Sequence, residues 1–219
     1  MKKTFLRSTK YERLSTVLDR LLAFDEKATH ALDGWMAGVD EAGRGPLAGP
    51  VVAAAVIFFG KKNLSGLNDS KKVIPKTRER LFREIARQAV VGVGVVDERQ
   101  IDALNIYQAT RLAMKRAVLA LNRTPDLLLI DGNMKLDLPL AQRAIVKGDQ
   151  RSASIAAASI IAKVFRDAWM LHLDGLYPQY GFKEHKGYPT PVHLTCLQRE
   201  GPSPVHRQSF SPVANCVVS

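Results

Sequence analysis

An α/β fold is predicted from two features of the sequence. Short apolar runs of strand length alternate along the chain with segments whose apolar residues recur at helical spacing. Several of these runs end in an aspartate followed by a turn, and in open α/β sheets functional groups gather where strands end and loops begin. With 219 residues and an apolar fraction of 46%, the chain can form one large domain, or one domain with a small appendage.

Residues 1–34 are predicted to form a basic helical extension. Their apolar residues recur at helical spacing, at Tyr11, Leu14, Val17, Leu18 and Leu21. The segment lacks the apolar core of a secretory signal. The cysteines, Cys196 and Cys216, form no C-x-x-C pair, so neither a zinc site nor a disulfide framework is expected. These features favour a cytoplasmic location.

A strand, a tight loop and a second strand are predicted over residues 35–59. Asp40 and Glu41 follow the first apolar run, and carboxylates of this kind suit a hard divalent cation such as Mg²⁺. Arg44 lies in the glycine-rich loop and can contact a phosphate with two donors. Neighbouring strand residues point to opposite faces, so Glu41 is expected to lie past the strand end, in the turn that Gly43 permits. The alternative is a hairpin with solvated acids.

The next elements are predicted from the same signals. Lys71 lies in a polar connection, and the two interpretations of this position are a solvated turn and a phosphate contact. A helix is expected to begin at Pro75, and a third strand covers residues 90–96. Asp97, with Gln100 three residues later, signals the start of another helix.

Two further strands are predicted to bring acids to the first pair. One apolar run ends at Asp131 and another leads to Asp149. Three strands with carboxylates at their ends would gather Asp40, Glu41, Asp131 and Asp149 at one edge of the sheet. Asp167 competes with Asp149 as the fourth acid, but it lies four residues after Lys163 on a predicted helix, where the two can simply pair.

The C-terminal part of the chain suggests a nucleic-acid partner. After residue 175, aromatic residues including Tyr188 alternate with lysines and turn residues, as in a groove where rings stack on sugars or bases. The alternative is a loop with packed tyrosines. The balance of 32 basic to 21 acidic residues, a formal charge of +11, favours a polyanionic partner. The longest apolar run is about half of a membrane span, so no membrane partner is expected.

Six ordered motifs then make the chain resemble type 2 ribonuclease H, specifically bacterial ribonuclease HII. They cover most of the sequence and are Gly38-Val39-Asp40-Glu41-Ala42-Gly43-Arg44-Gly45-Pro46, Asn68-Asp69-Ser70-Lys71-Lys72, Leu129-Ile130-Asp131-Gly132-Asn133, Val146-Lys147-Gly148-Asp149, Ser154 to Lys163, and His185-Lys186-Gly187-Tyr188. The resemblance implies a ribonuclease-H-like mixed sheet flanked by helices, with a C-terminal helical appendage. The expected division is an extension over 1–34, a catalytic domain over 35–175 and a substrate-binding appendage over 176–219.

The resemblance also implies a function. Such enzymes hydrolyse the RNA strand of RNA–DNA hybrids and cut DNA 5′ of single embedded ribonucleotides, leaving 3′-hydroxyl and 5′-phosphate ends. The implied metal ligands are Asp40, Glu41, Asp131 and Asp149, holding two Mg²⁺ or Mn²⁺ ions about 3.5–4 Å apart. The implied substrate-binding residues are Gly43, Arg44, Gly45, Lys71, Lys163 and Tyr188. The expected partners are RNA–DNA hybrids and ribonucleotide-containing DNA, bound by a monomer.

Two rival interpretations remain at this point. Ribonuclease HIII shares the fold, but it lacks the Gly-Arg-Gly loop and carries a separate N-terminal substrate-binding domain, for which residues 1–34 are too short. The other rival is a nucleic-acid-binding protein without catalysis, in which the acids are structural. Metal-dependent cutting separates this rival from an enzyme.

Overall fold

The computed structural model describes residues 5–30, 34–59, 64–70 and 73–216, with the backbone alone for residues 5–16. Its elements are α1 (Phe5–Thr29), β1 (Met36–Ala42), β2 (Val51–Phe58), α2 (Pro75–Gln88), β3 (Ala89–Val96), α3 (Glu98–Leu104), α4 (Ile106–Leu119), β4 (Leu127–Asp131), β5 (Ala141–Ile145), η1 (Gly148–Gln150), α5 (Ala153–Leu176), η2 (Pro178–Tyr180), α6 (Phe182–His185), α7 (Pro191–Glu200) and α8 (Ser211–Ala214). Two predicted helix starts are confirmed, since α2 begins at Pro75 and Asp97 caps α3. The Asp97 carboxylate accepts the N–H of Gln100 at 2.8 Å, as a helix cap should.

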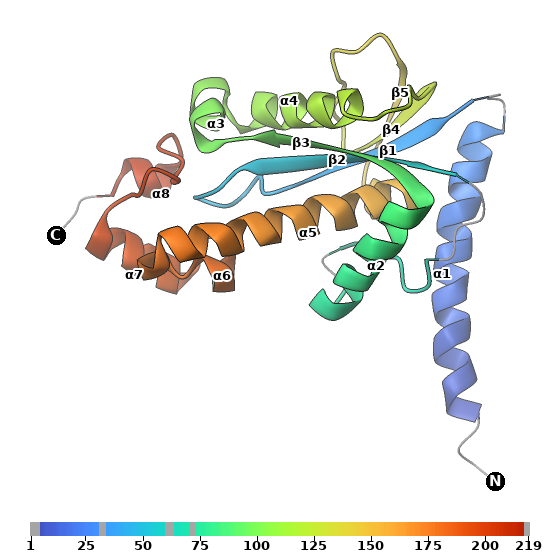
Figure 1. Ribbon diagram of the computed structural model, residues 1–219, viewed down its shortest axis with the longest axis horizontal. Coiled ribbons are helices and arrows are strands. Elements are labelled where there is room, and N and C mark those ends of the chain that lie inside the picture. The colour runs from blue at the N-terminus through green and yellow to red at the C-terminus, as the bar shows by residue number, and fades with distance from the viewer. Residues whose placement is uncertain (1–4, 31–33, 60–63, 71–72, 217–219) are drawn as a thin grey trace.

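The described strands form one mixed sheet in the order β3-β2-β1-β4-β5. β1 pairs in parallel with β4, which pairs in parallel with β5, whereas β2 runs antiparallel to both β1 and β3. In Figure 1, α3 and α4 cover one face of the sheet and α5 and α2 cover the other. This arrangement confirms the predicted α/β fold. It also puts the carboxyl ends of β1, β4 and β5 at one edge of the sheet.

The sheet is held between two apolar layers that follow from the alternation of its side chains. On one face, residues such as Val39 and Ile57 pack against Ala113 and Met114 of α4. On the other face, Val56 packs among the small residues of α5, including Ala157. The small side chains let α5 approach closely: a Cβ on Gly38 would lie 2.2 Å from the backbone of Ser154. The two layers fix α5 across the sheet, and α5 carries part of the pocket described below.

The first strand is longer than the sequence suggests, and the expectation for Glu41 is wrong. β1 continues through Asp40 and Glu41 to Ala42, and Glu41 stays in register opposite Ala53 of β2. The reason is that antiparallel pairing with β2 continues after the parallel partner β4 has left β1. Asp40 and Glu41 therefore alternate across the sheet, as regular strand residues do.

The N-terminal helix is anchored by a buried acid that the sequence did not single out. Asp25 is 1% exposed, and its carboxylate accepts hydrogen bonds from the Ser152 hydroxyl and from the N–H and hydroxyl of Ser154. Ser152 caps α5, and its hydroxyl also accepts the N–H of Ile155. The helix α1 is thus fastened to the start of α5, immediately after the turn that carries Asp149.

Replacing Asp25 with alanine is expected to destabilise the protein by about 2 kcal/mol or more, because hydrogen bonds to a charged group are lost and buried donors are left unpaired. Chemical denaturation measures the change. Asp19→Ala is the matched control, since Asp19 is exposed on the same helix. Equal stability of the two variants would show that the Asp25 contacts contribute nothing.

The C-terminal part of the chain packs against the far end of α5. Tyr180 and Phe182 are buried with Met170 of α5 in a separate apolar cluster. In Figure 1, α6, α7 and α8 lie at the opposite end of the molecule from α1. The expected division of the chain at residues 34 and 175 stays a prediction. None of the described helices combines the length and apolar character needed to cross a membrane.

Candidate active site

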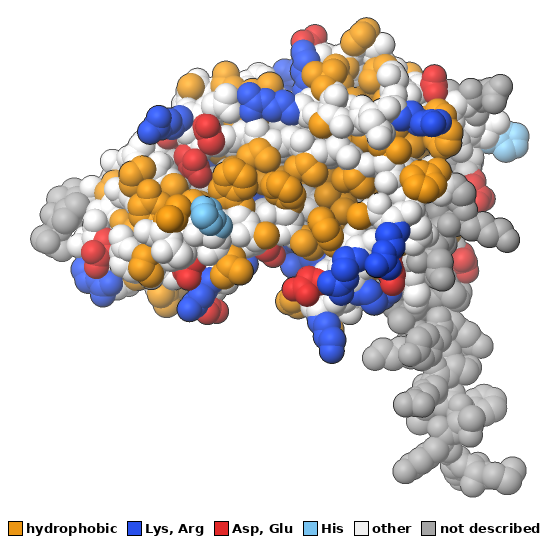
Figure 2. All heavy atoms as spheres, viewed as in Figure 1, with side chains coloured by type: hydrophobic (Ala, Val, Ile, Leu, Met, Phe, Trp, Pro, Cys, Tyr) orange, Lys and Arg blue, Asp and Glu red, His pale blue; other side chains and the backbone are white. Residues whose placement is uncertain are grey.

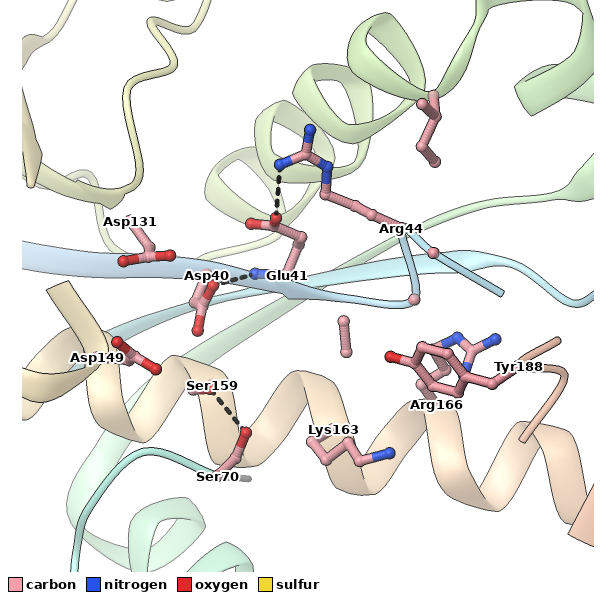
Figure 3. A pocket seen from close by; sticks show the side chains of 14 residues that line it. Asp40, Glu41, Arg44, Ser70, Asp131, Asp149, Ser159, Lys163, Arg166 and Tyr188 are labelled. Carbon is pink, nitrogen blue, oxygen red and sulfur yellow. Dashed lines mark hydrogen bonds and ion pairs between the residues drawn. The ribbon is translucent and has the colours of Figure 1, made fainter. Parts of the chain in front are cut away.

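A pocket of about 760 Å³ opens at the edge of the sheet where β1 and β4 end. It gathers residues from β1, the following loop, the end of β4, η1, α5 and the segment after α6. The lining residues are Asp40, Glu41, Ala42, Gly43, Arg44, Gly45, Ser70, Ile106, Asp131, Asp149, Ser159, Lys163, Arg166 and Tyr188. Figure 3 shows these side chains. Residues far apart in the sequence therefore share one site.

Three of the predicted acids converge because of the sheet topology. Asp40 lies on β1, and Asp131 is the last residue of β4, its parallel neighbour. Asp149 lies in η1, just before α5, and not directly at a strand end. Its turn is tied to β4, since the Asp131 carboxylate accepts the N–H of Gly148 at 2.6 Å. Figure 3 shows the three acids facing one region of the pocket.

Asp40 is the most constrained of these acids. Its side chain is 5% exposed, and its carboxylate accepts the N–H of Glu41 at 2.7 Å. Burial raises the pKa of Asp40 well above its ordinary value, and the nearby Glu41 and Asp131 carboxylates raise it further. A hydrogen bond from Ser159 opposes this rise, and Ser159 also bonds to Ser70 at 2.9 Å. The site thus concentrates negative charge that a cation would neutralise.

Glu41 reaches the pocket from the other side of the strand. In Figure 3 its side chain points away from Asp40 and toward Arg44. The Arg44 guanidinium lies 3.4 Å from the Glu41 carboxylate. Burial raises the pKa of Glu41, and the charge of Arg44 opposes that rise. Glu41 therefore lines the pocket from the side of Arg44, which is its ion-pair partner.

The carboxylates fit a hard divalent cation in donor chemistry. Within the described residues, no three His, Cys, Asp or Glu side chains lie close enough together to hold a metal ion by themselves. Repulsion between like charges keeps bare carboxylates apart, and Mg²⁺ usually retains waters and takes further ligands from substrate phosphates. An open set of acids in a pocket of about 760 Å³ is therefore the arrangement expected for a metal that is completed by substrate.

Asp167 lies outside this pocket and has partners of its own. Its carboxylate bonds to Lys163 at 2.7 Å and to Arg78 at 3.2 Å. Of the two candidates for the fourth acid, only Asp149 lines this pocket. Lys163 does line the pocket, but as a paired lysine whose pKa is lowered by burial. Lys71 lies outside the described residues.

The glycine-rich loop and Tyr188 form the other wall. Gly43 has φ +96°, and a Cβ there would lie 2.0 Å from the Arg166 Nε, so only glycine fits. A Cβ on Gly45 would lie 3.6 Å from the Tyr188 ring. Tyr188 is 41% exposed. An exposed ring beside a bare backbone offers a stacking surface and backbone donors at the same place.

Three polar lining residues were missed in the sequence as site residues: Ser70, Ser159 and Arg166. Ser70 and Ser159 lie inside two of the motifs described above. Residue spacing could not predict that their hydroxyls share a hydrogen bond. Arg166 lies on a small-residue helix whose pattern indicates core packing. Its pocket location depends on the loop folding back over α5.

Comparison with known proteins gives consistent similarities. A family model described as Ribonuclease HII matches residues 37–213. The chain is 56% identical over 179 residues to a ribonuclease HII of Geobacillus kaustophilus (strain HTA426). The aligned region covers 81% of this chain and 68% of that protein.

Solved structures share the fold. The ribonuclease H2 from Pyrococcus horikoshii OT3 is similar with a TM-score of 0.69 and 27% identity, covering 82% of this chain and 95% of that one. A structure described as Bst-RNase HIII in complex with Mn²⁺ has a TM-score of 0.65 at 20% identity, covering 85% of this chain and 70% of that one. At this identity the second likeness shows the fold alone.

Proposed function

The chain belongs to the ribonuclease HII family, and from this premise we propose that the acidic pocket at the end of β1 and β4 is its active site. The protein is a type 2 ribonuclease H. It is an endonuclease that hydrolyses the RNA strand of RNA–DNA hybrids, including single ribonucleotides in duplex DNA. It cuts on the 5′ side of the ribonucleotide and leaves 3′-hydroxyl and 5′-phosphate ends.

The reaction depends on divalent metal, and the proposed ligands are Asp40, Glu41, Asp131 and Asp149. Two ions, Mg²⁺ or Mn²⁺, are proposed. When bound, such ions lower the pKa of an attacking water and stabilise charge on the scissile phosphate and leaving oxygen. Asp40 and Asp131 hold their carboxylates on neighbouring strands, and the Gly148 N–H orients Asp131. Rigid backbone thus positions the charge before substrate arrives.

The other wall of the pocket is proposed to read the substrate. The Arg44 guanidinium, held near Glu41, suits a backbone phosphate. Backbone donors of the loop, Gly43 to Gly45, suit the 2′-hydroxyl that distinguishes RNA from DNA. The exposed Tyr188 ring, next to Gly45, suits the adjoining sugar. Lys163 would contribute positive charge near the scissile phosphate.

One observation carries this proposal. Acids from three segments share a single pocket with the glycine-rich loop and Tyr188, so the groups needed for hydrolysis lie beside those needed for recognition. All of these groups come from one chain, which suits a monomer. Cys196 and Cys216 are both free thiols, and this suits a reducing cytoplasm.

The duplex outside the cut is proposed to be bound through its phosphates. Lys and Arg side chains are spread over the face drawn in Figure 2, and several of them gather over α2. The formal charge of the chain is +11. Binding should therefore weaken as salt rises, because phosphate contacts release counterions.

The test is a DNA duplex with one ribonucleotide, incubated with Mg²⁺ and, separately, with EDTA. The expected result is a single cut 5′ of the ribonucleotide with Mg²⁺ and none with EDTA. An all-DNA duplex is the matched substrate control and should stay intact. Binding of both duplexes without any metal-dependent cut would reject the enzyme and favour the non-catalytic binding protein.

Replacing Tyr188 with alanine is expected to lower kcat/KM on a single embedded ribonucleotide by roughly 5- to 150-fold, the range for losing about 1–3 kcal/mol of stacking. Tyr188→Phe is the matched control, because it keeps the ring and should retain most activity. Steady-state kinetics on the same duplex measure both variants. Unchanged cutting by the alanine variant would remove Tyr188 from substrate recognition.

A further inference from the structure

The loop that lines the pocket is held from behind by Arg207, which is fully buried. Its guanidinium donates to the Gly43 carbonyl at 2.6 Å, the Arg44 carbonyl at 3.0 Å and the Gly49 carbonyl at 2.7 and 2.9 Å. Four hydrogen bonds thus run from one side chain to one loop. The contacts span 158 to 164 positions in the sequence, so they join the end of the chain to its first strand–loop–strand unit.

A second buried arginine completes this support. Arg166 is 1% exposed and donates to the carbonyls of Ala48, Pro50 and Lys186. In the part of the chain that the structure describes, neither arginine forms an ion pair with a carboxylate. A buried cation is normally paired with an acid, because burial without compensation is costly. Here backbone carbonyls accept the hydrogen bonds of both guanidinium groups, and the Glu98 carboxylate adds an attraction at longer range.

The contacts of Arg207 fix the direction in which backbone N–H groups of the loop point. In a trans peptide the C=O of one residue and the N–H of the next point in opposite directions. Because Arg207 holds the carbonyls of Gly43 and Arg44, the N–H groups of Arg44 and Gly45 point away from it, on the side where the loop lines the pocket. Among the described residues, no backbone carbonyl accepts from either N–H. Neither N–H is therefore used in the backbone hydrogen bonds of the described residues.

His206, the residue before Arg207, is connected to the Tyr188 backbone through His193. The Ser203 N–H donates to His206 Nδ1 at 3.0 Å, so the proton of the neutral His206 ring lies on Nε2. Nε2 then donates to His193 Nε2 at 3.0 Å, and His193 Nδ1–H donates to the Tyr188 carbonyl at 2.9 Å. Burial lowers the pKa of His193 and His206 to about 4, so both rings are neutral and this direction of donation holds at neutral pH.

Backbone contacts also join the glycine-rich loop to the His206–Arg207 pair and to the segment that carries Tyr188. His206 forms an antiparallel bridge with Ala48 of the loop, and the Arg207 N–H donates to the Leu47 carbonyl at 2.8 Å. The Leu47 N–H in turn donates to the carbonyl of Gly187, next to Tyr188. The loop, the Tyr188 segment and the His206–Arg207 pair therefore form one connected unit.

We propose that His206 and Arg207, assisted by Arg166 and His193, are positioning residues that set the spacing between the donors of Arg44 and Gly45 and the ring of Tyr188. This inference rests on the function proposed above. A lone ribonucleotide offers one 2′-hydroxyl, so both recognition elements must meet the substrate at one place. A continuous RNA strand offers 2′-hydroxyls at neighbouring positions and tolerates a displaced element better.

The test compares kcat/KM on two duplexes, one with a single ribonucleotide and one with a continuous RNA strand. Arg207→Met removes the donors and keeps the length of the side chain. It is expected to lower kcat/KM on the single ribonucleotide by about 10²-fold, as a small misplacement of reacting groups does. The loss of kcat/KM on continuous RNA should be at least about tenfold smaller, because this substrate tolerates a displaced loop or Tyr188 ring better.

Matched variants separate positioning from folding. His206→Leu removes the donor to His193 and should shift the ratio of the two kcat/KM values in the same direction. His206→Gln restores an amide donor near the Nε2 position and should recover most of that ratio. Arg199→Met changes an exposed arginine of α7 and should leave the ratio unchanged.

The outcomes distinguish the two proposals. Folded Arg207→Met and His206→Leu proteins that cut both duplexes with equal losses would overturn the positioning role. If Arg207→Met does not fold, the ratio is taken from His206→Leu and Arg207→Lys, and an unchanged ratio in those variants overturns the inference as well. A wild-type protein that cuts neither duplex would instead reject the proposed function.

Discussion

Asp40→Asn is expected to abolish cleavage and, at the same time, to make the metal-free protein more stable. Asp40 is buried and lies on β1 next to Asp131, and the Glu41 and Asp131 carboxylates both oppose its charge. Loss of a metal ligand should remove several kcal/mol of transition-state stabilisation, a fall of at least about 10³-fold in kcat. Asparagine has nearly the same shape but no charge, so it relieves the repulsion.

The stability effect has a definite pH dependence. The pKa of Asp40 is raised above its ordinary value of 3.8 by burial, then by Glu41 and Asp131. A group whose pKa is higher in the folded protein stabilises it below the unfolded-state value, and this stabilisation is lost as pH rises through the folded-state pKa. The metal-free wild-type protein should therefore lose stability over that range, and Asp40→Asn should lose less.

Thermal unfolding in EDTA between pH 4 and pH 8 measures the difference. Asp19→Asn is the matched control, because Asp19 is exposed on α1 and its loss of charge should leave the profile close to that of the wild type. A metal-free Asp40→Asn protein less stable than the wild type throughout this range would contradict the picture of crowded charges. Retained cleavage would remove Asp40 from the metal site.

Asp131→Asn is the second substitution with a large expected effect. The Asp131 carboxylate combines a proposed metal ligand with a structural contact, the 2.6 Å bond to the Gly148 N–H. Asparagine keeps an oxygen for that N–H and removes the charge. Cleavage should fall by about 10³-fold or more, while duplex binding changes little, because the proposed phosphate contacts are made by basic side chains and not by Asp131.

Asp131→Ala provides the comparison. Alanine removes the charge and the acceptor together, so the turn that carries Asp149 loses its tie to β4. This variant should lose cleavage as well and should also unfold at a lower temperature than Asp131→Asn. Single-turnover cleavage, a binding titration and thermal unfolding give the three readouts. Cleavage retained by Asp131→Asn would show that the charge at this position is not needed.

The alternation of apolar runs and helical patterns predicted the order of most elements and the convergence of the acids. These features depend on local sequence and on the rule that functional groups gather at one edge of a parallel sheet. The position of Glu41 was predicted wrongly, because the length of β1 is set by its pairing with β2, a partner that residue spacing does not reveal. Asp149 likewise lies in η1, where its position depends on the contact between Gly148 and Asp131.

The support behind the site could not be predicted from the sequence. The carbonyls that accept from the Arg207 and Arg166 side chains lie more than 100 positions away, with the exception of Lys186, and backbone carbonyls carry no residue identity that a pattern could show. Asp25 similarly meets Ser152 and Ser154 across more than 120 positions. Such contacts exist only once α5 lies across the sheet, so local rules give no signal for them.

The central claim is that acids from three segments hold divalent cations together. Isothermal titration of Mn²⁺ into the wild-type, Asp40→Asn and Asp131→Asn proteins tests it most directly, with Asp19→Asn as the control. The account predicts that the wild type and the control bind the ion, and that each site variant binds it at least about tenfold more weakly, since each lacks one charged ligand. Equal Mn²⁺ affinity in all four proteins would contradict it.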